Sequence, residues 1–226
     1  PATFSKKEDM EISGFLAAVI AWGQRKTIIN NSRRIMELMD HSPHDFILHH
    51  NDADLVPFQK FVHRTFNGDD CLTFIYALRK IYRREGGLEE AIARCFLKDK
   101  LNPGNGWYEF KRMFFDVPHL KRSEKHLPDP LKGSAAKRMN MFLRWMVRKD
   151  DKGVDFGIWK KPNPSELYIP LDVHSARVAR KLRLLKRKQN DWKAVLELTD
   201  RLRKIDPEDP IRFDFALFGM GVFEKY

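Results

Sequence analysis

A length of 226 residues with 42% hydrophobic side chains excludes a disordered tail and allows one good core, or two small lobes that share a cleft. The formal net charge of +11 favours nucleic acid as a partner over a merely solvated basic surface, because binding phosphates releases their counterions. No apolar run reaches the roughly 18 residues of a membrane span and no secretory leader opens the chain, so we expect a cytoplasmic protein associated with the nucleoid. Because Pro1 and not a methionine opens the sequence, we expect native residues upstream.

Apolar residues recur at the spacing of an α-helix along most of the chain, whereas alternating strand patterns are nearly absent. The sequence therefore predicts an all-α fold. The predicted helical segments, in chain order, are 12–20, 28–39, 72–81, 88–95, 139–146, 176–182 and 195–205. Two stretches break this spacing, Leu101–Trp107 and Lys149–Pro170, and the longer one is predicted to be a surface loop with a functional role.

The two cysteines, Cys71 and Cys95, lie far apart in the sequence, with no CxxC pair and no histidine pair nearby. This spacing supports neither a disulfide framework nor a zinc or iron–sulfur site, so both are predicted to be buried apolar thiols. His174 has no second histidine nearby either, which argues against a metal site there. We therefore expect the protein to work without a metal or another cofactor.

The most informative residues are a lysine and an aspartate. Lys137 ends the stretch Gly133-Ser134-Ala135-Ala136-Lys137 and leads into a predicted helix at 138–148. At a helix start, beside Arg138, the dipole and the neighbouring charge disfavour its ammonium form, so Lys137 can become a nucleophile. Asp172 lies across the loop in Ile169-Pro170-Leu171-Asp172-Val173-His174, and its carboxylate could stabilise a cation-like sugar at which a base departs.

Each of these residues also has a simpler interpretation. Lys137 could be an ordinary surface lysine, of which a basic chain has many. Asp172, two residues after Pro170, has the position of an N-cap for a helix at 173–185. An N-cap can also be catalytic, and the order and setting of the pair favour catalytic roles over chance.

These two stretches resemble the helix-hairpin-helix DNA glycosylases, whose bifunctional members carry a G-x-x-x-K motif at the second hairpin helix and a V-P-V-D-x-H-like motif downstream. The resemblance implies that Lys137 forms a Schiff base and that Asp172 is the essential aspartate. It is nearest to the 8-oxoguanine glycosylase/lyase branch, because the lysine is present and the four cysteines of the iron–sulfur branch are absent. The whole chain also resembles a bacterial protein family of unknown function, through the signature Lys-Arg-x-x-x-x-Leu-Arg-Trp-Met-Val-Arg at 137–148.

The resemblance implies a glycosylase-like unit of two helical lobes over 1–226, with the hairpin and catalytic region at 128–185 and an inserted loop at 149–170. The chain departs from the family in two ways. Ala135 stands where the hairpin normally has glycine, and alanine resists the positive φ that glycine permits. The insertion is also long, so it must bulge outward if Lys137 and Asp172 are to meet.

Further candidate residues would contact the substrate. Gln24 follows a segment similar to the first helix and loop of these enzymes, where a polar residue enters the space vacated by the flipped base. Met141 would lie against the base, and Phe218 is similar to a pocket aromatic near the C-terminus of those enzymes. Trp159, in the loop, is the best candidate to stack on an extruded base. The residues expected to contact DNA phosphates are Gly133, Ala135, Arg138, His174, Arg177, Arg180 and Lys181.

The sequence thus predicts a monomeric DNA repair glycosylase that excises an oxidised purine from double-stranded DNA, with lyase activity through the Schiff base of Lys137. Two alternatives stay open. One is a non-catalytic nucleic-acid-binding module of the same fold, and the other is a protein-interaction domain whose basic charge serves an acidic partner. Salt-dependent binding to DNA separates these two alternatives from each other.

Overall fold

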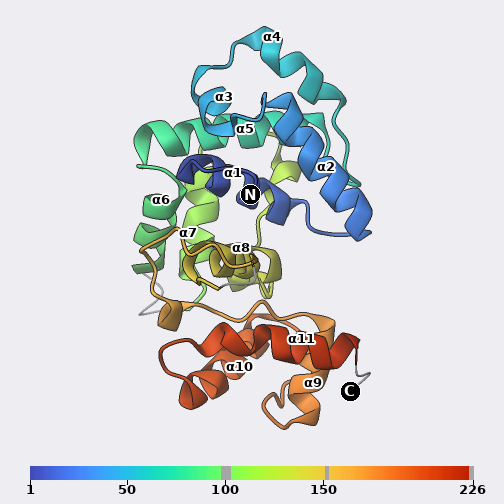
Figure 1. The fold of residues 1–226 in the computed structure, drawn as a ribbon, viewed down its shortest axis with the longest axis vertical. Coiled ribbons are helices and arrows are strands. Elements are labelled where there is room, and N and C mark those ends of the chain that lie inside the picture. The colour runs from blue at the N-terminus through green and yellow to red at the C-terminus, as the bar shows by residue number, and fades with distance from the viewer. Residues whose placement is uncertain (98–102, 151–152, 224–226) are drawn as a thin grey trace. The chain divides into compact units, whose positions relative to one another are not determined.

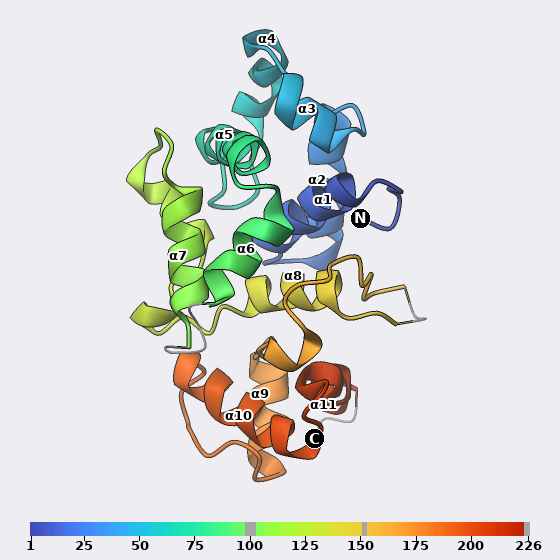
Figure 2. The same ribbon diagram turned by 90° about the vertical axis from the view of Figure 1, so that its left-hand side faces the viewer.

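The computed structural model describes residues 1–97, 103–150 and 153–223, and these residues are organised as helices and connecting segments (Figures 1 and 2). Among them only isolated β-bridges occur and no strand, so the predicted all-α class is confirmed. None of the described helices is long and apolar enough to cross a membrane. The chain divides into two compact units. The N-terminal unit comprises Pro1–Cys95 and Glu109–Leu127, and the C-terminal unit comprises Phe96–Tyr108 and Pro128–Tyr226.

A cluster of phenylalanine rings forms the core of the N-terminal unit. Phe15 contacts Phe74 and Phe114, with ring centroids 6.1 and 5.4 Å apart, and all three side chains are completely buried. Such ring contacts add packing energy beyond the buried area. Around this core α1 packs against α2 and α3, and α3 packs against α5. The helices of this unit are α1 (Lys7–Val19), α2 (Arg25–Leu38), α3 (Pro43–His49), α4 (Asp52–Leu55), α5 (Gly68–Arg84) and α6 (Leu88–Phe96, whose last residue belongs to the other unit).

The C-terminal unit contains the stretches that carry the candidate chemistry. Helix α7 (Asn105–Phe114) is divided between the units after Tyr108. The remaining helices are α8 (Lys137–Val147), α9 (Val173–Lys181), α10 (Trp192–Ile205) and α11 (Asp214–Val222), with short 3₁₀ turns at Pro130–Lys132, Pro164–Glu166 and Pro210–Phe213. Helix α11 packs against α9 (Figure 1), with the Phe218 ring edge-on to the His174 ring and the Gly221 carbonyl accepting a hydrogen bond from Arg177.

Each predicted helical segment is helical in the structure, and the differences lie at the ends and in the short helices. Helix α9 ends at Lys181 rather than near residue 185, because Arg183 adopts φ of +59°, which helices do not continue through. The stretch 101–107 was expected to be irregular, but α7 already begins at Asn105; residues 101 and 102 lie outside the described part. The helices α3, α4, α7 and α11 were not predicted, and of these α3 and α4 are too short for a recognisable repeat.

The loop at 149–170 does not bulge outward as predicted, but folds back along α8. The backbone N–H of Phe156 donates to the carbonyl of Trp145 at 2.7 Å, and that of Trp159 donates to the carbonyl of Met146 at 2.9 Å. The later part of the loop supplies the buried side chains of Leu167 and Ile169. Because these apolar side chains are removed from water, the loop is part of the core; residues 151 and 152 lie outside the described part of it.

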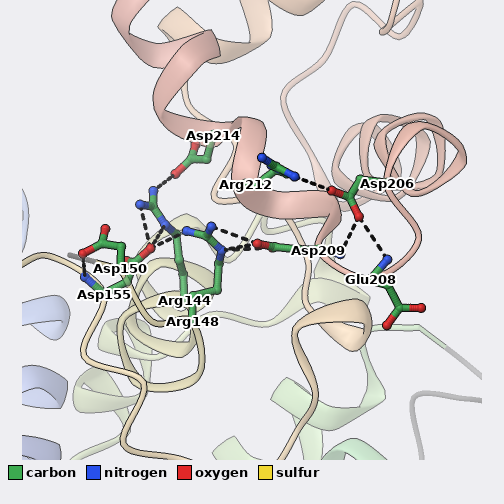
Figure 3. Close-up of polar contacts among 9 residues, drawn as sticks. All are labelled: Arg144, Arg148, Asp150, Asp155, Asp206, Glu208, Asp209, Arg212 and Asp214. Atoms are coloured by element: carbon green, nitrogen blue, oxygen red, sulfur yellow. Dashed lines mark hydrogen bonds and ion pairs between the residues drawn. The ribbon is translucent and has the colours of Figure 1, made fainter. Parts of the chain in front are cut away.

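A buried ion network anchors the second half of α8 (Figure 3). The Arg144 guanidinium, 2% exposed, donates to Asp155 through Nε and Nη2 at 3.2 and 3.0 Å and to Asp214 through Nη1 at 2.5 Å. One turn later, Arg148 donates to the same oxygen of Asp155 and to both carboxylate oxygens of Asp209. The network therefore connects α8 to the folded-back loop, to the turn before α11 and to the first residue of α11.

Replacing Arg144 with leucine should lower the free energy of unfolding by about 3 to 5 kcal/mol, because Asp214 loses its guanidinium partner and Asp155 keeps only Arg148. The matched control is Arg212→Leu, which removes the exposed pair with Asp206 in the same region (Figure 3) and should cost less than about 1 kcal/mol. Urea denaturation of both variants measures the difference. Equal losses would mean that the buried network does not contribute as a unit.

Candidate active site

A tight reversal of the chain places Lys137 at the start of α8. Gly133 adopts a left-handed conformation at φ of +88° after the 3₁₀ turn Pro130–Lys132, and a second left-handed residue, Ala136 at φ of +50°, is the N-cap of α8. Ala135, which raised doubt because it replaces a glycine, does not have a positive φ; the strained position is Ala136. Before the reversal, where the resemblance implies the first helix of the hairpin, the chain forms only one short 3₁₀ turn.

Asp172 is the N-cap of α9, as predicted. Its Oδ1 atom accepts hydrogen bonds from the backbone N–H groups of His174 and Ser175, both at 2.8 Å. These two N–H groups have no partner within the helix, so the carboxylate satisfies donors that would otherwise be unpaired. One oxygen of Asp172 is therefore committed to the backbone, and the other is left for a different partner.

That partner is Lys137, whose Nζ donates to Oδ2 of Asp172 at 3.1 Å although the residues are 35 positions apart in the sequence. The predicted proximity of the two side chains is confirmed. The lysine side chain is 46% exposed and that of the aspartate only 9%, so the amine is open to a ligand while the carboxylate is shielded. Burial raises the pKa of Asp172, but the Ser175 N–H and the Lys137 charge outweigh it, and the net pKa lies below its ordinary value. Asp172 is thus ionised at neutral pH.

A buried asparagine that sequence reasoning missed holds the two stretches in register. The Nδ2 of Asn140 donates at 3.4 Å to the carbonyls of Ala135, in the reversal, and Ile169, three residues before Asp172. Its Oδ1 accepts from the Trp107 indole N–H at 2.8 Å. The backbone N–H of Ile169 donates in turn to the Thr199 hydroxyl at 3.2 Å. A polar residue on the otherwise apolar face of the predicted helix was the available signal for Asn140.

Asp214 is a second carboxyl group whose charge is coupled to the pair. It begins α11, is 8% exposed, and accepts the hydrogen bond from Arg144. Burial raises the pKa of Asp214 to about 6; Arg144 opposes the rise, the negative charge of Asp172 adds to it, and Lys137 opposes it. This role could not be recognised from the sequence, because Asp214 lies inside an aromatic stretch and has the appearance of an ordinary acidic residue at a helix start.

The predicted base-contacting residues have different surroundings. Phe218 is 37% exposed, and its ring lies edge-on to the ring of His174, which is two residues after Asp172. Met141 is half-buried on α8. Trp159 is only 4% exposed, and its ring packs edge-on against Phe142, so the expectation that Trp159 stacks on an extruded base is wrong: it is a core residue. Gln24 is exposed at the N-cap of α2, in the N-terminal unit.

The predicted phosphate-contacting arginines are partly occupied inside the protein. Arg177 donates through Nη2 to the carbonyl of Gly221, and Arg180 donates to the carbonyls of Arg187 and Lys188, both at 2.8 Å. Their donors therefore fix α11 and the segment after α9, which corrects the view of both as free phosphate ligands. Burial lowers the pKa of Arg138, which is half-buried. The remaining predicted contacts, Gly133, Ala135, His174 and Lys181, lie at the reversal and along α9, and of these Gly133 and Lys181 are exposed.

The prediction that both cysteines are buried thiols is confirmed, since Cys71 and Cys95 are buried and free. Burial, with a smaller contribution from the Asp70 charge, raises the pKa of Cys71, so its thiol is unreactive. Within the described residues no group of three or more His, Cys, Asp or Glu side chains is placed to hold a metal ion.

The model of a family described as "Protein of unknown function (DUF2400)" matches residues 1–223. No curated protein and no solved structure matches the chain.

Because the folded-state pKa of Asp214 lies above its ordinary value of 3.8, the folded protein binds a proton between about pH 4 and 6 that the unfolded chain does not. The free energy of unfolding should therefore fall with rising pH across this window, relative to Asp214→Asn, which does not titrate. We expect the difference between parent and variant to change by about 1 to 3 kcal/mol, measured by urea denaturation from about pH 4 to 7. A flat difference would indicate an ordinary carboxyl group.

Proposed function

The chain belongs to the DUF2400 family, and we propose that it is a DNA glycosylase that excises an oxidised purine through Lys137 and Asp172. The observation that carries the proposal is the 3.1 Å contact between a half-exposed amine and a shielded carboxylate. The pair is assembled from two distant stretches, and each residue begins a helix. That juxtaposition of a nucleophile and a charge-stabilising group is what base excision with Schiff-base formation requires.

Lys137 would act as the nucleophile. Its ammonium gives up a proton to the departing purine, and the nitrogen lone pair forms a bond to C1′ as the C1′–N9 bond breaks. A second proton moves from that nitrogen to the sugar ring oxygen, whose bond to C1′ opens to leave an imine. The position at the first residue of α8 supports this role, because it leaves the side chain of Lys137 46% exposed, where a nucleotide can reach the amine.

Asp172 would stabilise the cation-like sugar as the base departs. Its Oδ1 is fixed by two backbone N–H groups, so Oδ2 is held in one direction without any reorganisation during the reaction. Its lowered pKa keeps the carboxylate charged at neutral pH. The same hydrogen bonds that cap α9 therefore prepare the electrostatic environment of the amine.

The surroundings of the pair suit an extruded nucleotide. Phe218 offers an exposed aromatic ring next to His174, which suits stacking on a flipped base. Helix α8 begins at Lys137, and the N-terminus of a helix of this length can bind phosphate. The net charge of +11 supports a polyanionic partner.

A non-catalytic nucleic-acid-binding module is the second candidate function. The Lys137 amine is engaged by Asp172 in the structure, and a nucleophile needs a free amine. In this alternative the pair is a structural link between α8 and α9.

Borohydride reduction tests the two candidates directly. The parent protein should form a covalent adduct with an oligonucleotide duplex that contains an abasic site or an oxidised purine, and Lys137→Gln should abolish the adduct, because reduction fixes only an imine. Lys132→Gln, which changes an exposed lysine in the turn before the reversal, is the matched control and should trap normally.

Asp172→Asn retains an oxygen for the α9 cap but loses the charge, so turnover should fall by roughly 100-fold or more with little loss of stability.

If the parent protein forms no adduct with either oligonucleotide but still binds duplex DNA, the non-catalytic module is favoured. If Lys137→Gln forms as much adduct as the parent, the lysine is wrongly assigned.

A further inference from the structure

A basic hollow lies where the segment that joins α9 to α10 meets the first turns of α10. It has a volume of about 510 Å³ and is lined by Lys186, Arg187, Lys188, Gln189, Lys193 and Glu197. Four of these side chains are basic and one is acidic, and no apolar side chain lines the hollow. The segment that forms its rim, residues 182–191, joins the two helices and is called the α9–α10 loop below.

Internal hydrogen bonds hold the α9–α10 loop in a fixed shape. Arg180, on α9, donates to the carbonyls of Arg187 and Lys188, and the Glu197 carboxylate on α10 accepts from the backbone N–H groups of Lys186 and Arg187 at 2.6 and 3.2 Å. The loop backbone is thereby bonded to both flanking helices. Arg180 of α9 and Glu197 of α10 thus hold the loop part of the hollow, and α10 itself supplies Lys193 and Glu197 to the lining.

The charges in the hollow are of two kinds. Arg187 is paired with Asp191, and Glu197 is committed to the loop backbone, so neither is available to an external ligand. By contrast, the ammonium groups of Lys186, Lys188 and Lys193 are exposed, and they form no ion pair or hydrogen bond with any residue that the structure describes. The hollow therefore presents a surplus of positive point charges.

The hollow is also tied to the reversal that precedes Lys137. The backbone N–H of Trp192, the first residue of α10, donates to the carbonyl of Gly133 at 3.3 Å. The Trp192 indole N–H donates to the carbonyl of Pro103 at 3.1 Å, which holds this residue from a second side. Lys193 directly follows Trp192, so the free lysine on α10 is fixed relative to the start of α8.

We propose that the basic hollow binds a phosphate group of the DNA backbone, separate from the phosphate that the start of α8 would hold. Ammonium groups on flexible stems bind phosphate as point charges, whereas a protein partner would require an aromatic or apolar anchor, which the lining lacks. The inference takes its partner, duplex DNA, from the proposed function, but it does not depend on the base-excision reaction. The hollow would hold the duplex in register with Lys137 whether or not base excision follows.

A charge-removal experiment tests the hollow. The triple variant Lys186→Gln, Lys188→Gln, Lys193→Gln removes the exposed charges, and the control Lys149→Gln, Arg201→Gln, Lys204→Gln removes three exposed charges elsewhere in the same unit. The dissociation constant for an undamaged duplex is measured between about 50 and 200 mM KCl. The hollow variant should bind about tenfold more weakly at the lower salt concentration and lose about 1 or more from the slope of log affinity against log salt, and the control should lose much less.

Equal changes in the two triple variants would overturn the proposal, since they would report net charge and not a site. An unchanged slope in the hollow variant would overturn it as well, and so would a parent protein that does not bind duplex DNA. Borohydride trapping separates this result from the proposed function. A parent that binds duplex through the hollow but forms no adduct supports the hollow and contradicts the glycosylase.

Discussion

The carboxylate of Asp172 is the point on which the candidate site depends. One of its oxygens accepts hydrogen bonds from two N–H groups in the first turn of α9, and the other accepts a hydrogen bond from Lys137 at the start of α8. A side chain this short can do both only if the two helix starts are held a few ångströms apart. The side-chain amide of Asn140 supplies that restraint. It is buried and donates to the carbonyls of Ala135 and Ile169, which lie in the segments that lead to Lys137 and to Asp172. The geometry of the pair is thus a property of the backbone and not of two flexible side chains that happen to meet.

Helix α8 is held by charge at both of its ends. At its start Lys137 contacts Asp172, and in its last turns Arg144 and Arg148 contact the buried Asp155. Buried ion pairs add little net stability, because the cost of desolvating the charges nearly equals their attraction. What they add is a preference for one arrangement, since any other packing of α8 leaves charges unpaired in the core. Asp214 connects the charges at the two ends of α8, because it accepts a hydrogen bond from Arg144 and because the charges of Asp172 and Lys137 affect its pKa.

The sequence allowed most of the helices and the proximity of Lys137 and Asp172 to be predicted, but not the residues that bring these two together. Helical periodicity is a local signal, so segments such as 139–146 and 195–205 could be recognised without knowing their neighbours. The N-cap role of Asp172 was equally local. The partners of Asn140, Arg144 and Asp214 are distant in the sequence, and no spacing rule connects them. Trp159 and the loop around it were misjudged for the same reason, because a stretch without helical periodicity can still bury its side chains when tertiary contacts satisfy its backbone.

Several arginines of the C-terminal unit donate to groups inside the protein, whereas the lysines of the basic hollow are exposed. Arg144, Arg148 and Arg180 donate to internal carboxylates or carbonyls, because the planar guanidinium presents several donors in a fixed geometry that matches such acceptors. The lysines of the basic hollow have no such internal partner among the described residues. The net charge of +11 does not say where on the surface the positive charge lies. A phosphate approaching this unit would encounter lysine ammonium groups, and the arginines that dominate the sequence pattern of α9 act instead to fix the surface that carries them.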